Sequence, residues 1–111
     1  MSPVAVVTGA ARGMGAATVD LLVAAGWQVV AVDSAADDPA LDYPLATKVD
    51  LEEVAIRHGA NVRAVVGDVR SASDMQAAVE AAVTHFGGLQ AAVAAAGILL
   101  FRRGKWKRQQ I

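Results

Sequence analysis

Four short apolar runs constrain the fold more than any other feature of this 111-residue chain. Each run is almost continuously apolar, a pattern typical of strands buried on both faces of a parallel sheet. Segments with helical periodicity lie between the runs, so strands and helices are predicted to alternate. The predicted fold class is therefore α/β with a doubly wound parallel sheet. The runs are residues 4–7, 28–32, 62–66 and 89–93.

Two helices are predicted before the third run. The first covers residues 14–25 and is expected to end at Gly26. A shorter helix over about residues 49–58 follows a loop at residues 34–48, which is unusually long for a connection in this kind of fold. The apolar residues expected to turn the first helix towards the sheet are Ala17, Leu21 and Ala24.

A third helix is predicted over residues 72–86. Ser71, with Asp74 three residues later, predicts a capping box at its start, and Gly87 is expected to end it. The apolar stripe expected to face the sheet consists of Met75, Val79, Val83 and Phe86.

A glycine-rich bend lies between the first run and the first helix, with the spacing G-x-x-x-G-x-G. Gly9 permits a tight turn, Gly13 lets the backbone approach a pyrophosphate, and Gly15 lets the helix pack against the strand. The N–H groups and the dipole at the helix start favour phosphate. Asp33 ends the second run about 20 residues further on. A carboxylate at this position accepts hydrogen bonds from the ribose hydroxyls and repels a 2′-phosphate. This arrangement predicts a dinucleotide site that prefers NAD to NADP.

The order of these motifs resembles the short-chain dehydrogenase/reductase family. Thr8-Gly9-x-x-x-Gly13-x-Gly15 is similar to that family's cofactor fingerprint, and Asp68-Val69 to its adenine-contacting pair. The resemblance covers residues 4–97 and implies a Rossmann-like sheet of order 3-2-1-4, truncated after about four strands. It also implies an NAD-dependent oxidoreductase acting on an alcohol or ketone. The cofactor-binding residues it implies are Gly9, Ala11, Arg12, Gly13, Met14, Gly15, Asp33, Asp68, Val69, Ala95 and Gly97.

The chain departs from the family pattern in two places. Ala94-Ala95-Ala96-Gly97 stands where the family usually has Asn-Asn-Ala-Gly, which puts the nicotinamide end of the site in doubt. Arg12 occupies a position where a basic residue in the family can favour NADP. We expect Arg12 to be solvated or to face the pyrophosphate, because Asp33 would meet the additional phosphate directly.

The loop suggests a narrower resemblance. Asp37-Asp38-Pro39-Ala40-Leu41 and Tyr43-Pro44-Leu45-Ala46-Thr47 are similar to the insertion of the mycofactocin-associated members of the family. In those members the implied NAD is held so tightly that an external redox partner must recycle it.

No catalytic residue is assigned. The family's chemistry uses a Ser, a Tyr-x-x-x-Lys pair and an Asn upstream of them, all of which would follow the fourth strand. The tyrosine transfers a proton to or from the substrate. Tyr43 is the only tyrosine, and Lys48 is one position too far along to match the pair. We therefore expect the chain to be the NAD-binding portion of such an enzyme. The catalytic half is expected to be missing, so the chain should be inactive alone. The alternative is a non-catalytic nucleotide-binding module that works with a partner chain.

The last residues have a different composition from the rest. All eleven acidic residues lie at or before Glu80, and five of the ten basic residues lie in the last ten. We therefore divide the chain into a dinucleotide-binding domain, residues 1–97, and a divergent basic tail, residues 98–111. The tail, with Trp106, has residue types that bind single-stranded nucleic acid, but its abrupt change in composition favours a shifted reading frame or a truncated gene.

The fourth strand is expected to be an open edge of the sheet, through which copies of the chain self-associate.

Composition excludes other classes. Cysteine is absent, which excludes disulfides and thiolate metal sites, and the N-terminus lacks a signal sequence, so a cytoplasmic setting is expected. The apolar stretch at residues 91–101 is shorter than the ~20 residues of a membrane span. His58 and His85 are expected to complement helix dipoles, and the loop aspartates to be solvated, so no metal site is predicted. Those aspartates are Asp37, Asp38 and Asp42.

Overall fold

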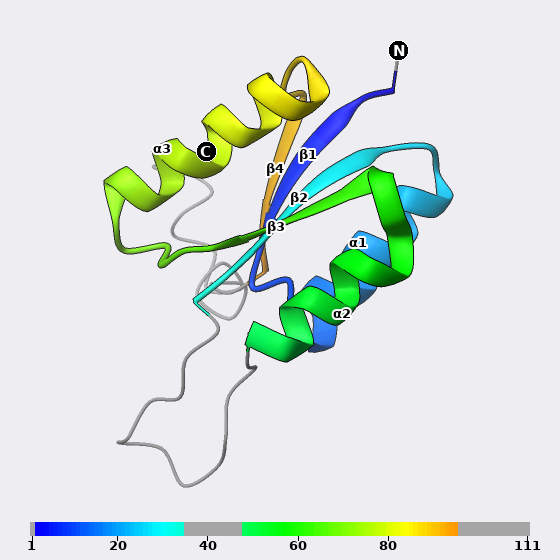
Figure 1. Ribbon diagram of the computed structural model, residues 1–111, viewed down its shortest axis with the longest axis horizontal. Coiled ribbons are helices and arrows are strands. Elements are labelled where there is room, and N and C mark those ends of the chain that lie inside the picture. Colours follow the sequence, from blue (N-terminus) through cyan, green and yellow to red (C-terminus); the bar gives the residue numbers. More distant parts are fainter. Residues whose placement is uncertain (1, 35–47, 96–111) are drawn as a thin grey trace, which may run out of the picture.

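The computed structural model describes residues 2–34 and 48–95. These residues form a four-stranded parallel sheet of order β3-β2-β1-β4, with helices on both faces (Figure 1). The α/β class and the strand order predicted from the sequence are confirmed. The strands are β1 (Val4–Thr8), β2 (Gln28–Asp33), β3 (Val62–Val66) and β4 (Ala91–Ala94).

The sheet is built around β1, which pairs with β2 from Val4↔Gln28 onward and with β4 from Ala5↔Ala91 onward. All five residues of β1 are buried. Successive side chains point to opposite faces, with Val7 in the core under α1 and α2 and Val6 in the core under α3. Burial on both faces explains why the runs are continuously apolar.

Three helices cover the sheet. α1 (Gly13–Ala24) and α2 (Lys48–His58) lie on one face, and α3 (Ala72–Ala81) lies on the other (Figure 1). A 3₁₀ turn, Gly59–Asn61, follows α2, and a π-helical turn, Ala82–Phe86, extends α3. Gly26 and Gly87 have φ angles of 93° and 88°, as expected of glycines that end helices.

The face of α1 predicted from the sequence is wrong. Leu21 is 72% exposed, and the residues that face the sheet are Gly15 and Val19. α1 is apolar nearly all round, so its periodicity does not single out a face; the close approach of Gly15 to the preceding bend fixes it instead. The other two predicted residues, Ala17 and Ala24, are also exposed.

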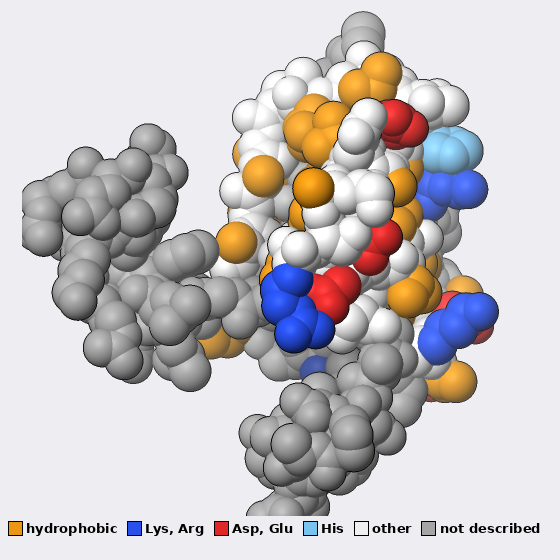
Figure 2. All heavy atoms as spheres, turned by 90° about the vertical axis from the view of Figure 1, so that its left-hand side faces the viewer, with side chains coloured by type: hydrophobic (Ala, Val, Ile, Leu, Met, Phe, Trp, Pro, Cys, Tyr) orange, Lys and Arg blue, Asp and Glu red, His pale blue; other side chains and the backbone are white. Residues whose placement is uncertain are grey.

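The stripe predicted on α3 is also partly wrong. Ala78 and Ala82 make the buried contact with the sheet, whereas Val79 and Val83 are exposed. Small side chains face the sheet because they let the helix approach the strands closely, and Met75 and Phe86 pack at the margins of this contact. On this side of the molecule, hydrophobic side chains are interspersed with charged ones (Figure 2).

An ionic contact joins α1 to α2. Asp20 Oδ1 lies 2.6 Å from His58 Nε2 and accepts a hydrogen bond from Arg57 Nη2 at 3.0 Å. The hydrogen bond with His58, followed by that with Arg57, lowers the pKa of Asp20. His58 lies in the last turn of α2, as predicted, but its ring contacts the neighbouring helix. In residues 2–34 and 48–95, no helix is long and apolar enough to cross a membrane.

We predict that Leu51→Ala destabilises the protein by about 2–5 kcal/mol, because Leu51 of α2 is fully buried in the core. The matched control is Ile56→Ala on the same helix, where the side chain is 77% exposed and the change should stay within about 0.5 kcal/mol. Urea unfolding followed by circular dichroism measures both. Equal losses of stability in the two variants would show that α2 does not pack as described.

Candidate functional site

The bend between β1 and α1 has the backbone that its glycines predict. Gly9 and Gly13 have φ angles of 69° and 61°, in the left-handed region that side chains rarely adopt. Between them Ala10 and Ala11 are buried. The bend therefore lies tightly folded at the carboxyl end of the central strand, the edge of an open parallel sheet where ligands bind.

Gly13 and Gly15 have opposite surroundings. A methyl group on Gly15 would overlap the Gly9 carbonyl, so α1 packs directly onto the bend; the sequence had suggested packing against the strand. Apart from its chain neighbours and the backbone of its own helix, no atom of the described residues lies within 4 Å of the position that a Cβ of Gly13 would take. Arg12, the residue before α1, supplies no side-chain cap to the helix. The bend is thus closed on its inner side and open where helix N–H groups attract an anion.

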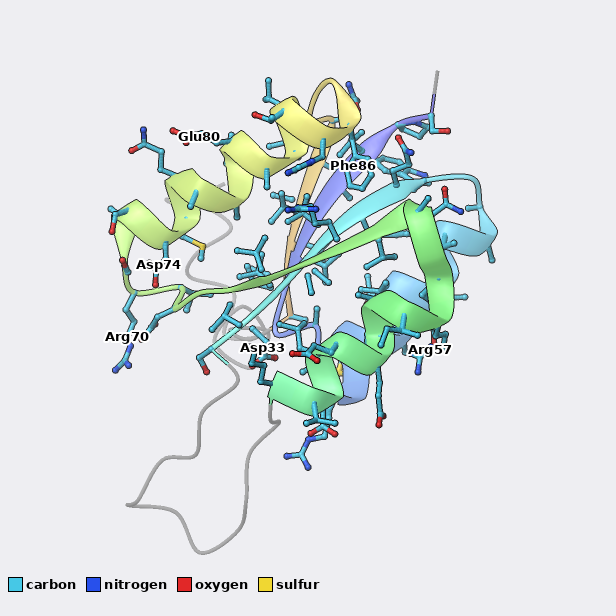
Figure 3. All side chains as sticks on the ribbon, viewed as in Figure 1. Asp33, Arg57, Arg70, Asp74, Glu80 and Phe86 are labelled. Carbon is cyan, nitrogen blue, oxygen red and sulfur yellow. The ribbon has the colours of Figure 1, made fainter. Side chains whose placement is uncertain are left out.

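Asp33 is tied to this bend. It ends β2 (Figure 3), and its Oδ2 accepts a hydrogen bond from the Ala11 N–H at 3.1 Å. The Ala10 N–H donates to the Val32 carbonyl, also at 3.1 Å. These two bonds fix the glycine bend against the carboxyl end of β2.

A hollow of about 130 Å³ opens beside Asp33, between the ends of β2 and β3. Small-molecule pockets usually measure ~300–1,000 Å³, so this hollow suits one end of an extended ligand. Four of its residues were predicted from the sequence: Gly9, Asp33, Asp68 and Val69. Three were missed: Val32, Ser34 and Gly67. Strand order would have pointed to them, because β2 and β3 are neighbours and the residues that follow them meet.

The other predicted residues lie beside the hollow or beyond it. Ala11, Arg12, Gly13, Met14 and Gly15 form the bend and the first turn of α1, with Met14 60% exposed. Ala95 follows β4, on the other side of β1 from the hollow. The two ends of the predicted site therefore lie on either side of β1. Gly97 lies outside the described residues.

The side chain of Asp68 is engaged by its neighbour Arg70. Arg70 Nη2 donates to Asp68 Oδ2 at 2.7 Å, and the Arg70 N–H and Nε donate to Oδ1 at 2.8 and 3.0 Å. These hydrogen bonds lower the pKa of Asp68 to about 2. The carboxylate at this wall of the hollow is therefore ionised at neutral pH.

A larger cavity, about 520 Å³, lies elsewhere. It borders the start of β3 and the end of the π-helical turn, and its lining includes Arg63, His85 and Phe86. None of the residues predicted to bind a cofactor lines it, so its size does not make it the candidate site. Among the described residues, no three His, Cys, Asp or Glu side chains are grouped so as to hold a metal ion.

Comparison with known proteins identifies the family. The family model for short chain dehydrogenases matches residues 3–110. The chain belongs to this family.

Curated relatives agree with this assignment. An uncharacterized oxidoreductase of Mycobacterium tuberculosis is 38% identical over 104 residues, which cover 91% of this chain and 38% of the relative. The cis-2,3-dihydrobiphenyl-2,3-diol dehydrogenase of Paraburkholderia xenovorans is 37% identical over 92 residues, covering 83% and 29%. The chain thus spans about a third of the length of these short-chain dehydrogenases.

Solved structures have the same fold. A carveol dehydrogenase from Mycobacterium avium, in complex with NAD, matches with a TM-score of 0.79 and 33% identity, over 86% of this chain and 35% of that one. A short chain dehydrogenase from Mycobacterium paratuberculosis, bound to NAD, matches with a TM-score of 0.79 and 35% identity, over 86% and 36%. The narrower mycofactocin-associated resemblance stays a prediction, since its loop lies outside the described residues.

We predict that Arg70→Gln raises the pKa of Asp68 from about 2 towards its ordinary value of 3.8, because the guanidinium hydrogen bonds are lost. A folded-state pKa below the unfolded one stabilises the protein above pH 3.8, and this contribution is lost as the pH falls towards 2. Carboxyl-carbon NMR titration measures the shift. Arg57→Gln, which removes a basic residue paired with Asp20, is the control and should leave Asp68 unchanged.

Proposed function

We propose that this chain binds NAD, with the diphosphate at the Gly9–Gly15 bend and the adenosine at the hollow beside Asp33. It serves as the nucleotide-binding portion of an oxidoreductase that interconverts an alcohol and a ketone. The residues proposed to hold the cofactor are the eleven implied by the family resemblance, of which Gly9 is the first and Gly97 the last, together with Val32, Ser34 and Gly67. We propose that the protein acts in the cytoplasm and that residues 1–97 form the dinucleotide-binding domain.

The hydrogen bond from the Ala11 N–H to Asp33 carries this proposal. It places a carboxylate, the group that binds ribose hydroxyls, directly against a bend whose backbone suits phosphate. The open space at Gly13 leaves room for the diphosphate. Both features are in place in this chain's own residues, so the site fits a dinucleotide.

The preference for NAD over NADP rests on charge. Asp33 borders the hollow, where the ribose of adenosine would lie, and a 2′-phosphate there would face its carboxylate. Arg12 is exposed and directly precedes α1, at the bend where we place the diphosphate. The NAD in two matching solved structures is consistent with this preference.

The relatives support the class of substrate. They include a carveol dehydrogenase and a cis-2,3-dihydrobiphenyl-2,3-diol dehydrogenase, which are named for hydroxyl-bearing compounds. The nicotinamide would supply the chemistry by accepting or donating a hydride. This chain's residues bind and orient the cofactor, and a proton-transferring tyrosine and lysine are not assigned among them.

The test of NAD binding uses two substitutions of Asp33. We predict that Asp33→Ala weakens NAD binding at least ~10-fold, because both the ribose acceptor and the acceptor for the Ala11 N–H are lost. Asp33→Asn keeps an oxygen for Ala11 but loses the charge, so the discrimination against NADP should fall while the bend stays in place. Calorimetry with NAD and NADP measures both. Unchanged affinities for the two cofactors in both variants would contradict the assignment.

A non-catalytic nucleotide-binding module that works with a partner chain would use the same site. Both candidates bind NAD, but only the oxidoreductase requires a Tyr-x-x-x-Lys segment. Reading the DNA that follows the gene in all three frames separates them. If no frame encodes such a segment, the module is the better description.

We also propose that copies of the chain self-associate through β4. Among the described strands, β4 pairs on one side only, with β1, and Ala92 and Ala94 are exposed. An open apolar strand edge promotes pairing between chains. We predict that the apparent mass measured by light scattering rises with concentration, and a constant monomer mass would contradict this.

A further inference from the structure

Asp74, in the first turn of α3, supports one wall of the hollow from behind. Its Oδ2 accepts a hydrogen bond from the Asp68 N–H at 2.9 Å. Asp74 itself does not line the hollow, whereas Gly67, Asp68 and Val69 do. Figure 3 shows Asp74 at the start of α3, next to the turn that carries Arg70.

Gly67 is enclosed between Asp74 and β2. A methyl group on Gly67 would lie 3.3 Å from Asp74 Cβ and 3.5 Å from Val32 Cγ1. The Gly67 N–H donates to the backbone carbonyl of Asp33 at 2.9 Å. Asp74 and β2 thus lie close on either side of Gly67, and the hydrogen bond to the Asp68 N–H links Asp74 directly to the wall that faces Asp33.

The capping box predicted from the sequence is only half formed. The Asp74 N–H donates to Ser71 Oγ at 3.2 Å, so Ser71 caps α3 as predicted. In a full capping box the Asp74 carboxylate would accept from the Ser71 N–H in return. The Ser71 N–H instead donates to the Asp68 carbonyl at 2.9 Å, and the Asp74 carboxylate binds the Asp68 N–H. Helix capping and support of the turn are thus divided between two side chains.

We propose that Asp74 is a positioning residue for the adenosine end of the nucleotide site and that it acts through the backbone of Gly67 and Asp68. This inference rests on the proposed function. Without the Asp74 carboxylate, the half-buried Asp68 N–H loses its acceptor and the turn is free to shift. Asp68 and Val69 then no longer hold the position in which they border the hollow opposite Asp33.

The experiment compares four substitutions in the full chain, with AMP as the probe. Asp74→Asn keeps an acceptor oxygen and should bind AMP like the unchanged protein. Asp74→Ala should bind AMP about 10-fold more weakly, as expected when a buried N–H loses its partner. Ser71→Ala is the matched control, because it removes the α3 cap but leaves the Asp68 N–H bonded. Asp74→Leu, similar in size to asparagine but without an acceptor, replaces the alanine variant if the latter fails to fold.

Amide hydrogen exchange supplies a readout that does not depend on any ligand. The Asp68 amide should exchange faster in Asp74→Ala than in Ser71→Ala or Asp74→Asn. If Asp74→Ala binds AMP as tightly as Ser71→Ala, the positioning role is overturned and the proposed function stands. If the unchanged protein binds neither AMP nor NAD, the proposed function fails, and this inference fails with it.

Discussion

The hydrogen bond between the Ala11 N–H and Asp33 is the contact on which the site depends. The glycine bend follows β1, and Asp33 ends β2, so the bond joins segments 22 residues apart in the sequence. The parallel pairing of β1 with β2 brings them together, since Thr8 lies opposite Val32. Asp33 Oδ2 accepts this bond, and Asp33 also lines the hollow. The same side chain therefore shapes the bend and is proposed to receive the sugar.

The walls of the site are held mainly by backbone groups. Ala10 is bonded to the Val32 carbonyl, Gly67 to the Asp33 carbonyl, and Asp68 to Asp74. These bonds run across the ends of β1, β2 and β3 to the start of α3, so the hollow is assembled from three consecutive β–α units. A site of this kind exists only when the sheet is formed, because its walls come from segments that are separated in the sequence.

Sequence patterns were sufficient for the sheet and for the bend. The continuous apolar runs predicted parallel strands, and the spacing of Gly9, Gly13 and Gly15 predicted a strand-to-helix bend, both of which the structure contains. The buried face of α1 was not predictable, because apolar residues surround that helix and Leu21 is as apolar as Val19. On α3 and the π-helical turn that extends it, the apolar stripe predicted that Val79 and Val83 face the sheet. The smaller Ala78 and Ala82 make this contact instead.

The same division applies to the site. Asp33 was predictable because it ends an apolar run after the glycine bend, and Asp68 because the resemblance to the family implies it. Gly67 and Ser34 belong to no recognised motif and were missed, although the predicted adjacency of β2 and β3 could have pointed to them. The role of the Asp74 carboxylate was hidden by the capping-box pattern, which predicts the bond to Ser71 correctly but not the one to Asp68.

The two contacts of Asp68, with Arg70 and with Asp74, differ in how firmly they fix this residue beside the hollow where adenosine is proposed to bind. Arg70 is 87% exposed on its side chain, and exposed ion pairs contribute little to stability, so this contact holds the turn only weakly. The bond from the Asp68 N–H to Asp74 is partly buried, and an N–H shielded from water is destabilising when its acceptor is removed. The backbone of the turn is therefore held more firmly by Asp74 than by Arg70, and the Asp68 side chain is proposed to exchange Arg70 for a hydrogen-bond donor of the ligand. A firm backbone and an exchangeable carboxylate together suit a wall that must recognise a ligand and release it.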